Sequence, residues 1–212
     1  MTDSQQDKML SGVADLYTKS LAEHGLDPMS VGWRSAEQQQ LRFDKLAVVM
    51  TGEQSERISV NDWGCGYGAM FDYLNAQLGS RLSNYYGYDI SSEMLSAAHQ
   101  HVTDPRAQFS SAAQVTEVAD YSFVSGTFNV RLQTSEADWQ AYMETTLRNL
   151  ASHSRRGFAF NVLTSYVDWK EDHLYYADPT FYFDFCKRHI SKYVTLLHDY
   201  PLYEWTMCVR MS

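Results

Sequence analysis

The stretch Ile58-Ser59-Val60-Asn61-Asp62-Trp63-Gly64-Cys65-Gly66-Tyr67-Gly68-Ala69-Met70-Phe71-Asp72-Tyr73-Leu74 decides the fold. Residues 58–61 alternate like a strand, and residues 69–74 begin a helical pattern that Gly79 can end. Three alternating glycines lie between these two elements. Because glycine has no Cβ, the backbone there can turn tightly and a bound molecule can lie against it. The stretch therefore predicts a strand, a binding loop and a helix in succession.

A second signal follows about twenty residues further along, at the distance expected of a ribose-binding acid. The run Tyr85-Tyr86-Gly87-Tyr88-Asp89-Ile90 predicts a short aromatic strand that ends in a carboxylate, and Ser91 can cap the next helix. A carboxylate at this point can accept hydrogen bonds from the two hydroxyls of a ribose. The two signals together indicate a cofactor that contains a nucleoside.

Two cofactors match such a loop and acid. The pattern Gly64-x-Gly66-x-x-Ala69 satisfies the relaxed dinucleotide fingerprint, in which the helix N-terminus receives a pyrophosphate. Asp62 argues against a dinucleotide, because a carboxylate two residues before the first glycine repels phosphate but can accept a hydrogen bond from an ammonium group. S-adenosylmethionine carries an adenosine and an amino-acid tail without phosphate, so it is favoured over NAD.

Through residues 60–68 and 87–91 the chain resembles the class I S-adenosylmethionine-dependent methyltransferase family, and it does so more loosely from about residue 10 to the C-terminus. The resemblance implies an α/β fold that is Rossmann-like and doubly wound, with a mostly parallel seven-stranded sheet, an antiparallel C-terminal hairpin and a helical N-terminal extension. It also implies that the cofactor is bound by Asp62, Gly64, Cys65, Gly66, Gly68, Asp89 and Ile90.

Two positions depart from the family pattern. Asn61 replaces the apolar residue usual in the first strand. The stretch Phe109-Ser110-Ser111-Ala112-Ala113 lacks the acid that often binds the adenine amino group. We therefore expect backbone groups near Ser111 and Ala112 to recognise the adenine.

The segment 121–129 predicts the fourth strand and its exit loop, which in the family passes beside the reactive sulfonium. The resemblance implies that Ser125, Gly126 and Phe128 are neighbours of the methyl group, and Asn129 could orient an acceptor through its amide. The alternative is that Phe128 belongs to the core and Asn129 caps a turn.

The N-terminal segment folds over the cofactor mouth in similar methyltransferases, so the resemblance implies that Tyr17 or Trp33 touches the cofactor or the acceptor. Tyr17 also shares a helical stripe with Leu16 and Leu21 and could serve packing alone. We expect residues 1–50 to form a helical cap, with a break at 24–28 and a second helix over 35–50.

The remaining pattern alternates strands and helices, which is typical of parallel sheets covered on both faces. Strands are expected near 57–62, 84–89, 107–110, 121–125, 157–163, 193–199 and 203–210, and helices near 69–78, 92–101, 136–151 and 179–190. Arg155-Arg156, before the fifth strand, is expected in a solvated turn. We expect one domain over 1–212, with the Rossmann-like core at 51–212.

The connection 164–179 is long, acidic and aromatic, and such loops at the ligand end of a sheet often act as lids. His173 is the candidate general base, with Tyr175 as a further catalytic candidate, and aromatic walls with carboxylates would suit an amine. Alternatively, these side chains pack the loop onto the sheet and His173 lies at the surface. The acids around His173 match no ligand-spacing motif, so no metal is expected.

Composition sets outer bounds. The chain has 212 residues, 44% of them hydrophobic, and no apolar stretch long enough to span a bilayer. A net charge of −9 argues against a nucleic-acid substrate. The start lacks the pattern of a secretion signal, which favours a cytoplasmic location, and three scattered cysteines indicate free thiols. The pattern leaves both a monomer and a homodimer open.

These inferences predict methyl transfer from S-adenosylmethionine to a small-molecule acceptor, through a nitrogen or oxygen nucleophile, by in-line displacement that leaves S-adenosylhomocysteine. A noncatalytic protein that binds the cofactor as a sensor or partner subunit is the alternative. An NAD-dependent oxidoreductase is less favoured, since Asp62 is poorly placed for a pyrophosphate.

Overall fold

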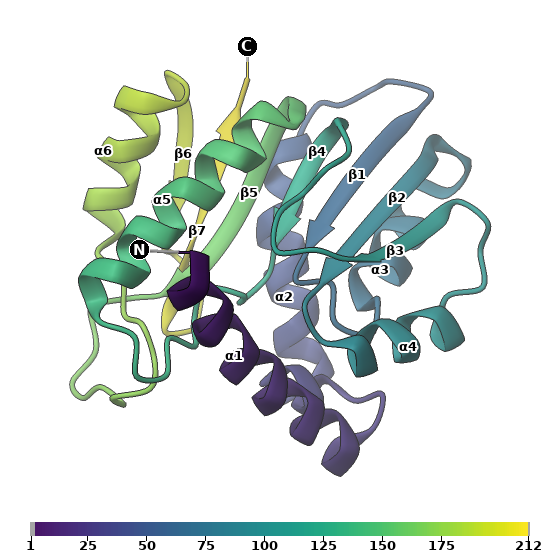
Figure 1. Cartoon of the computed structure of the whole chain (residues 1–212). Coiled ribbons are helices and arrows are strands. Elements are labelled where there is room, and N and C mark those ends of the chain that lie inside the picture. Colours follow the sequence, from purple (N-terminus) through teal and green to yellow (C-terminus); the bar gives the residue numbers. More distant parts are fainter. Residues whose placement is uncertain (1–2, 212) are drawn as a thin grey trace.

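One sheet forms the centre of the molecule (Figure 1), whose computed structural model describes residues 3–211. Within those residues it has seven strands in the order β3-β2-β1-β4-β5-β7-β6. Their bounds are β1 Ile58–Trp63, β2 Leu82–Asp89, β3 Ala107–Ser111, β4 Ala119–Val124, β5 Ser154–Leu163, β6 Tyr193–Leu197 and β7 Glu204–Arg210. Strands β1 to β5 pair in parallel, whereas β7 runs antiparallel to β5 and β6. The predicted fold class is confirmed.

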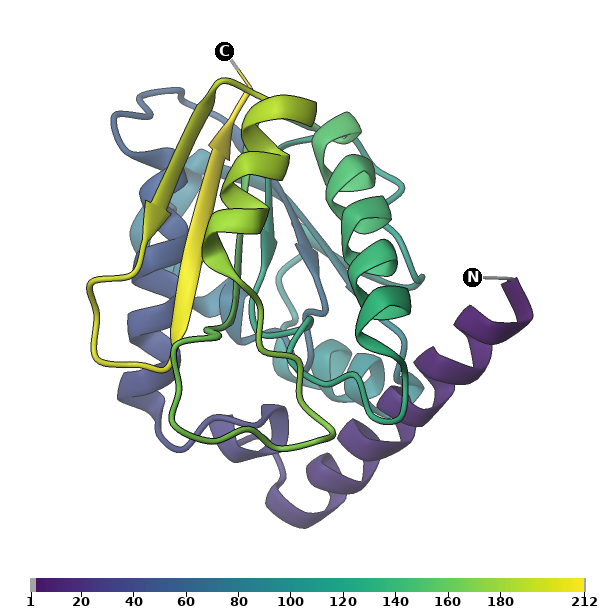
Figure 2. The ribbon, with the colours of Figure 1, turned by 90° about the vertical axis from the view of Figure 1, so that its left-hand side faces the viewer.

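Helices cover both faces of this sheet (Figure 2). Helices α5 (Glu136–Ser152) and α6 (Pro179–His189) pack on one face, over buried rings such as Phe158, Phe160 and Trp205. Helices α2 (Ala36–Ala47) and α3 (Ala69–Leu78) pack on the other face, and α4 (Ser92–His101) packs beside β2 and β3. The central strands are largely buried on both faces, as expected of parallel strands between two helical layers.

Helix α1 (Asp3–His24) lies outside the two layers, at the end of the sheet where β1 and β2 end (Figures 1 and 2). The 3₁₀ turn η1 (Pro28–Val31) follows it, and the side chain of Asp27 accepts a hydrogen bond from the Met29 N–H to cap that turn. The expected break after residue 24 is present. Two further turns, η2 (Val48–Met50) and η3 (Gly79–Arg81), follow α2 and α3.

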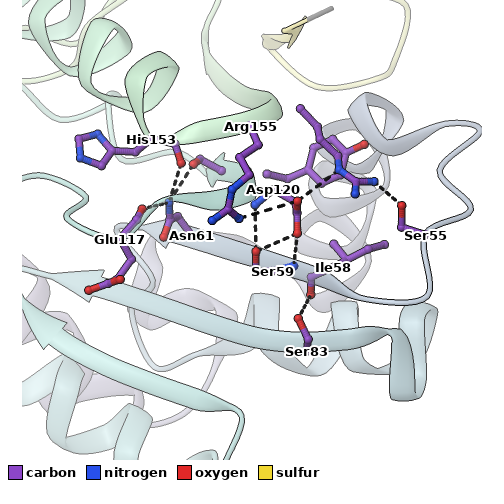
Figure 3. Close-up of polar contacts among 12 residues, drawn as sticks. Ser55, Ile58, Ser59, Asn61, Ser83, Glu117, Asp120, His153 and Arg155 are labelled. Atoms are coloured by element: carbon purple, nitrogen blue, oxygen red, sulfur yellow. Dashed lines mark hydrogen bonds and ion pairs between the residues drawn. The ribbon is translucent and has the colours of Figure 1, made fainter.

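The connection from β3 to β4 is unusually short for a crossover between parallel strands. Residues 112–118 cross the front of the sheet in Figure 1 without helical structure, whereas such crossovers usually need a dozen residues and a helix. With no helix of its own, the connection takes hydrogen-bond partners for its peptide groups from elsewhere in the chain. Asn61 of β1 supplies one, because its Nδ2 donates to the Glu117 carbonyl at 2.9 Å (Figure 3).

Three further side chains bind the backbone of the same connection. The Trp63 indole donates to the Ala113 carbonyl at 3.3 Å, and the Tyr88 hydroxyl accepts from the Glu117 N–H at 3.1 Å. Asn149 of α5 binds both the N–H and the carbonyl of Val115. The Asn61 amide thus supplies a hydrogen bond of the kind that a crossover helix would make internally.

The predicted solvated turn at Arg155-Arg156 is wrong, because β5 already begins at Ser154. Asp120 and Glu53 provide the reason. The Arg156 guanidinium lies 3.2 Å from an Asp120 oxygen and 2.6 Å from a Glu53 oxygen, and Arg155 approaches Asp120 at 3.9 Å. Asp120 also accepts hydrogen bonds from the Ser59 N–H and hydroxyl, so this cluster ties β1, β4 and β5 together at their amino ends (Figure 3).

Candidate cofactor and active site

The glycine loop after β1 has the geometry that the sequence predicts. Gly64, Gly66 and Gly68 have φ values of 79°, 54° and 91°, and Gly68 is the N-cap of α3. At Gly64 a side chain has no room, since a Cβ there would lie 2.1 Å from the Thr127 hydroxyl. The loop thus passes directly under the exit loop of β4 and leaves its backbone open to a ligand.

Asp89, at the end of β2, is bound to this loop. Its Oδ2 accepts from the Gly66 N–H and its Oδ1 accepts from the Ser91 N–H, each at 2.9 Å. Burial raises the pKa of the Asp89 carboxyl, and the hydrogen bonds from Ser91 and Gly66 oppose that rise. The carboxylate therefore links the loop to the next helix and faces the cavity described below.

Asp62, near the end of β1, is almost completely buried. Burial raises the pKa of its carboxyl to about 7, and the negative charge of Asp89 adds to the rise, whereas a hydrogen bond from the Tyr85 hydroxyl opposes it. A positive group placed beside Asp62 would favour the charged carboxylate. The site can thus bind a cation by a charge-assisted hydrogen bond.

The main cavity has about 640 Å³ of empty space, part of it open to solvent. The ends of β1 and β2, helices α1, α4 and α5 and two loops form its walls. Its lining residues are Leu10, Val13, Tyr17, Val31, Trp63, Gly64, Gly66, Tyr88, Asp89, Ile90, Met94, Ala112, Ser125, Thr127, Trp139 and Tyr142. Helix α1 contributes a stripe at helical spacing, and burial together with the charge of Asp89 raises the pKa of Tyr17 to about 12.

Two further cavities adjoin it. One, of about 310 Å³, contains Trp33, Asp62 and Cys65 and shares Val31, Gly64 and Ser125 with the main cavity. The other, of about 580 Å³ and more open, contains Ser111 and Ala113 and shares Leu10, Ile90 and Ala112. Through these shared residues the three cavities adjoin one another, and together they make a depression from Asp62 to the end of β3.

Ser125 lies where the main cavity meets the cavity of Asp62. Its Oγ is buried and has no hydrogen-bond partner within residues 3–211. Buried hydroxyls are rarely left unpaired in native structures, so this atom is available to a bound molecule. Together with Asp62 and the open glycine backbone, it makes a polar end that fits the ammonium and carboxylate of an amino-acid tail.

Most of the predicted cofactor-binding residues therefore border this depression: Tyr17, Trp33, Asp62, Gly64, Cys65, Gly66, Asp89, Ile90, Ser111, Ala112 and Ser125. Gly126 lies behind the wall, against the ring of Trp33. Phe128 is fully buried in the core and packs on Trp63 and Phe160 rather than on the cavity. Gly68 starts α3 and lines none of the three cavities.

The three predicted catalytic residues line none of the three cavities. The Asn129 side chain accepts from the Leu163 N–H, and its carbonyl accepts from the Tyr175 N–H. Tyr175 is buried, with its hydroxyl 2.9 Å from that of Tyr182. The His173 side chain is about half exposed and lies 3.5 Å from Glu171. In the described structure no residue of 164–179 lines the three cavities.

Several lining residues escaped the sequence analysis. Trp139 and Tyr142, three residues apart on α5, present one face to the cavity. Their spacing is a visible signal, but an aromatic pair on a helix is usually part of the core. Thr127 lies inside the exit loop of the segment 121–129. Nothing in the sequence distinguishes Val31 from a residue that serves packing alone.

A family model described as a methyltransferase domain matches residues 60–157. A Mycobacterium tuberculosis protein, named Putative methyltransferase Rv1506c, is 51% identical over 161 residues, which cover 74% of this chain and 96% of that protein. The chain belongs to the class I S-adenosylmethionine-dependent methyltransferases.

Solved methyltransferases share the fold of this family member. Magnesium protoporphyrin IX methyltransferase (ChlM) from Synechocystis PCC 6803, with bound SAH, superposes with a TM-score of 0.64 at 16% identity over 97% of both chains. The plantazolicin methyltransferase BpumL, in complex with SAH, gives a TM-score of 0.60 at 14% identity over 98% of this chain and 99% of that one. At these identities the likeness shows the fold alone.

Two further observations concern the described residues 3–211 of this methyltransferase. None of their helices is both long enough and apolar enough to cross a membrane. They also contain no group of three histidine, cysteine or acidic side chains placed to hold a metal ion.

Proposed function

We propose that this methyltransferase transfers the methyl group of S-adenosylmethionine to a small-molecule acceptor through a nitrogen or oxygen nucleophile. The observation that carries the proposal is the row of adjoining cavities, in which the glycine loop lies between two buried carboxylates. We assign the ribose to Asp89, the amino-acid tail to Asp62 and Ser125, and the adenine to the wall near Ile90 and Ala112. The pairing of Asp62 with an ammonium group and the unpaired Ser125 hydroxyl support this assignment.

The rest of the main cavity supports an uncharged acceptor with an apolar body. Trp139, Tyr142, Leu10 and Val13 form walls that remain beyond the polar groups assigned to the cofactor. Among the described lining residues of the main cavity there is no lysine, arginine or histidine, so an acidic acceptor would have no charge partner. The acidic loop 164–179 lines none of the cavities, and we therefore do not assign the selection of an amine to it.

The chemistry asks little of the protein beyond placement. Bound S-adenosylmethionine supplies an electrophilic methyl carbon on a good leaving group. The walls of the cavity exclude water and orient the lone pair of the acceptor toward that carbon, which is where alignment accelerates displacement. No base is assigned, so the acceptor must present a free lone pair, and its proton passes to solvent.

Calorimetry with the purified chain tests the cofactor. We expect micromolar binding of S-adenosylmethionine and S-adenosylhomocysteine that is lost in Asp89→Ala, with NAD not binding. Binding of NAD alone would overturn the proposal. Incubation with a library of neutral amines and hydroxyl compounds, followed by mass spectrometry, then tests the acceptor. Turnover by the wild type and not by Asp89→Ala supports the assignment, whereas cofactor binding without turnover across all classes favours a sensor.

A further inference from the structure

A chain of buried polar groups connects α2 to the exit loop of β4. The Arg42 Nε lies 2.9 and 3.0 Å from the two carboxylate oxygens of Glu204 in β7. The Asn161 Nδ2 of β5 donates to Glu204 at 3.1 Å, and the Asn161 Oδ1 accepts from the Gly126 N–H at 2.7 Å. All four residues are buried. A side chain distant in sequence thus holds the peptide between Ser125 and Gly126.

Arg42, at the other end of this chain of polar groups, also contacts Trp33. The Arg42 guanidinium lies 3.8 Å from the centroid of the Trp33 ring, a cation–π contact. The same ring also packs against Gly126, where a Cβ would lie 2.2 Å from it. Trp33 lines the Asp62 cavity, and Ser125 lines both that cavity and the main one. Both ends of the chain of polar groups therefore contact residues of the wall between the Asp62 cavity and the main cavity.

Stability alone does not account for such an arrangement. Burial raises the pKa of Glu204, which means that removing its charge from water opposes ionisation, and Arg42 and Asn161 offset only part of that effect. A buried ion pair can often be replaced by apolar side chains of similar volume without loss of stability. What a fully satisfied polar network provides in addition is one fixed arrangement of the groups it joins.

We propose that Arg42, Glu204 and Asn161 are positioning residues, which hold Ser125, Gly126 and Trp33 in the arrangement that the cofactor's amino-acid end requires. The inference rests on the proposed function, because the wall matters only if that end binds there. It assigns no contact with the cofactor to Arg42, Glu204 or Asn161 themselves. Their loss should weaken cofactor affinity without removing any group that touches the cofactor.

The decisive variant is the paired replacement Arg42→Met with Glu204→Leu, which removes the charges together. We expect it to fold, with a melting temperature near that of the wild type, and to bind S-adenosylhomocysteine at least tenfold more weakly by calorimetry. Asn161→Leu, which detaches only the Gly126 N–H from the network, should weaken binding to a similar degree. A melting temperature reports structure, whereas the affinity of a folded variant reports positioning.

Ser154→Ala is the matched control. Ser154 is buried in the same strand as Asn161, and its hydroxyl binds Ser122 at 2.7 Å, but it lies at the opposite end of the sheet. We expect it to lower the melting temperature and to leave the affinity within twofold of the wild type. If the paired variant fails to fold, Asn161→Leu decides.

The outcomes separate the two proposals. If the wild type does not bind S-adenosylhomocysteine, the proposed function fails, and this inference fails with it. If the wild type binds and the folded paired variant or Asn161→Leu binds equally well, the positioning role is overturned while the proposed function stands. Weaker binding in folded variants, with normal binding in Ser154→Ala, supports the positioning role.

Discussion

The Tyr85 hydroxyl of β2 donates a hydrogen bond to Asp62 of β1, and both side chains are buried beneath the glycine loop. The pair makes the charge of Asp62 sensitive to small changes. Burial raises the pKa of the carboxyl to about 7 from an ordinary value of 3.8, and the phenol limits that rise. In the unliganded protein this carboxyl therefore changes charge close to neutrality.

Cofactor binding should accordingly depend on pH. If the ammonium of the cofactor pairs with ionised Asp62, the affinity for S-adenosylhomocysteine should rise as the pH increases through about 7. Asp62→Asn should bind more weakly, by roughly tenfold or more, and should lose this pH dependence. Tyr85→Phe removes the hydrogen bond that lowers the pKa, so its binding midpoint should move to higher pH. Calorimetry across the range checks all three, and a wild-type profile that matches Asp62→Asn would contradict the assignment.

The ionisation of Asp62 should affect protein stability in the direction opposite to its effect on cofactor binding. The folded-state pKa of Asp62 is raised, so the folded protein retains a proton that the unfolded chain releases between pH 3.8 and about 7. The contribution of Asp62 to the free energy of unfolding therefore falls as pH rises through this window. Asp62→Asn does not ionise, so its melting temperature relative to the wild type should increase from about pH 5 to about pH 8. A constant difference across that range would exclude a raised pKa.

Gly64 offers a steric test of the loop. Gly64→Ala would place a methyl group 2.1 Å from the Thr127 hydroxyl at a φ of 79°, so we expect loss of cofactor binding. Gly52→Ala is the control, because Gly52 has a φ of 84° and nothing lies within 4 Å of the position that a Cβ would take there. It should cost about 1 kcal/mol of stability from backbone strain alone and keep its affinity. Equal effects of the two substitutions on binding would count against a site at Gly64.

Glu53 tests the cluster at the amino ends of the strands. Burial alone would raise its pKa, but hydrogen bonds from Arg156, Ser55 and Tyr121 outweigh burial and hold the pKa well below its usual range. Its stabilisation is therefore present above the ordinary value of 4.5 and is lost as the pH falls below it. Glu53→Gln should lower the free energy of unfolding by about 1–2 kcal/mol at neutral pH and by less in acid. Urea unfolding at the two pH values measures this, with cofactor affinity expected to be unchanged.

His173 and Tyr175 test the lid hypothesis. Because neither side chain lines any of the three cavities, His173→Gln should leave both cofactor affinity and methyl transfer within twofold of the wild type. Tyr175→Phe should cost about 1 kcal/mol through the lost contact with Tyr182, again without an effect on affinity. A large loss of turnover in His173→Gln with unchanged cofactor binding would restore its candidacy as a base.

Local sequence pattern was sufficient to predict the glycine loop and the strand that ends at Asp89, because turn-forming residues and strand alternation can be recognised within a few neighbouring residues. The start of β5 shows the limit of that reasoning. Arg155 and Arg156 have the composition of a solvated turn, and only Glu53 and Asp120, distant in sequence, make them part of a strand.

Tertiary contacts also decide which of the predicted site residues line the three cavities. His173 has suitable chemistry for a base, but the course of its loop depends on tertiary contacts, such as the bond from the Arg131 guanidinium to the Leu174 carbonyl at 3.1 Å. Phe128 and Trp139 show that two residues of the same chemical type can take different places. Both are aromatic residues near the exit of β4, and only packing decides that Trp139 borders the cavity while Phe128 lies wholly in the core.

The short crossover over residues 112–118 has a consequence for the order of assembly. The Val115 and Glu117 amides are bound by Asn149 and Tyr88, which come from α5 and β2, so they gain no protection from a local turn or helix. The segment can become ordered only once those elements have met. In hydrogen exchange, these two amides should therefore open when α5 separates from the sheet, which makes them reporters of tertiary docking rather than of local fraying.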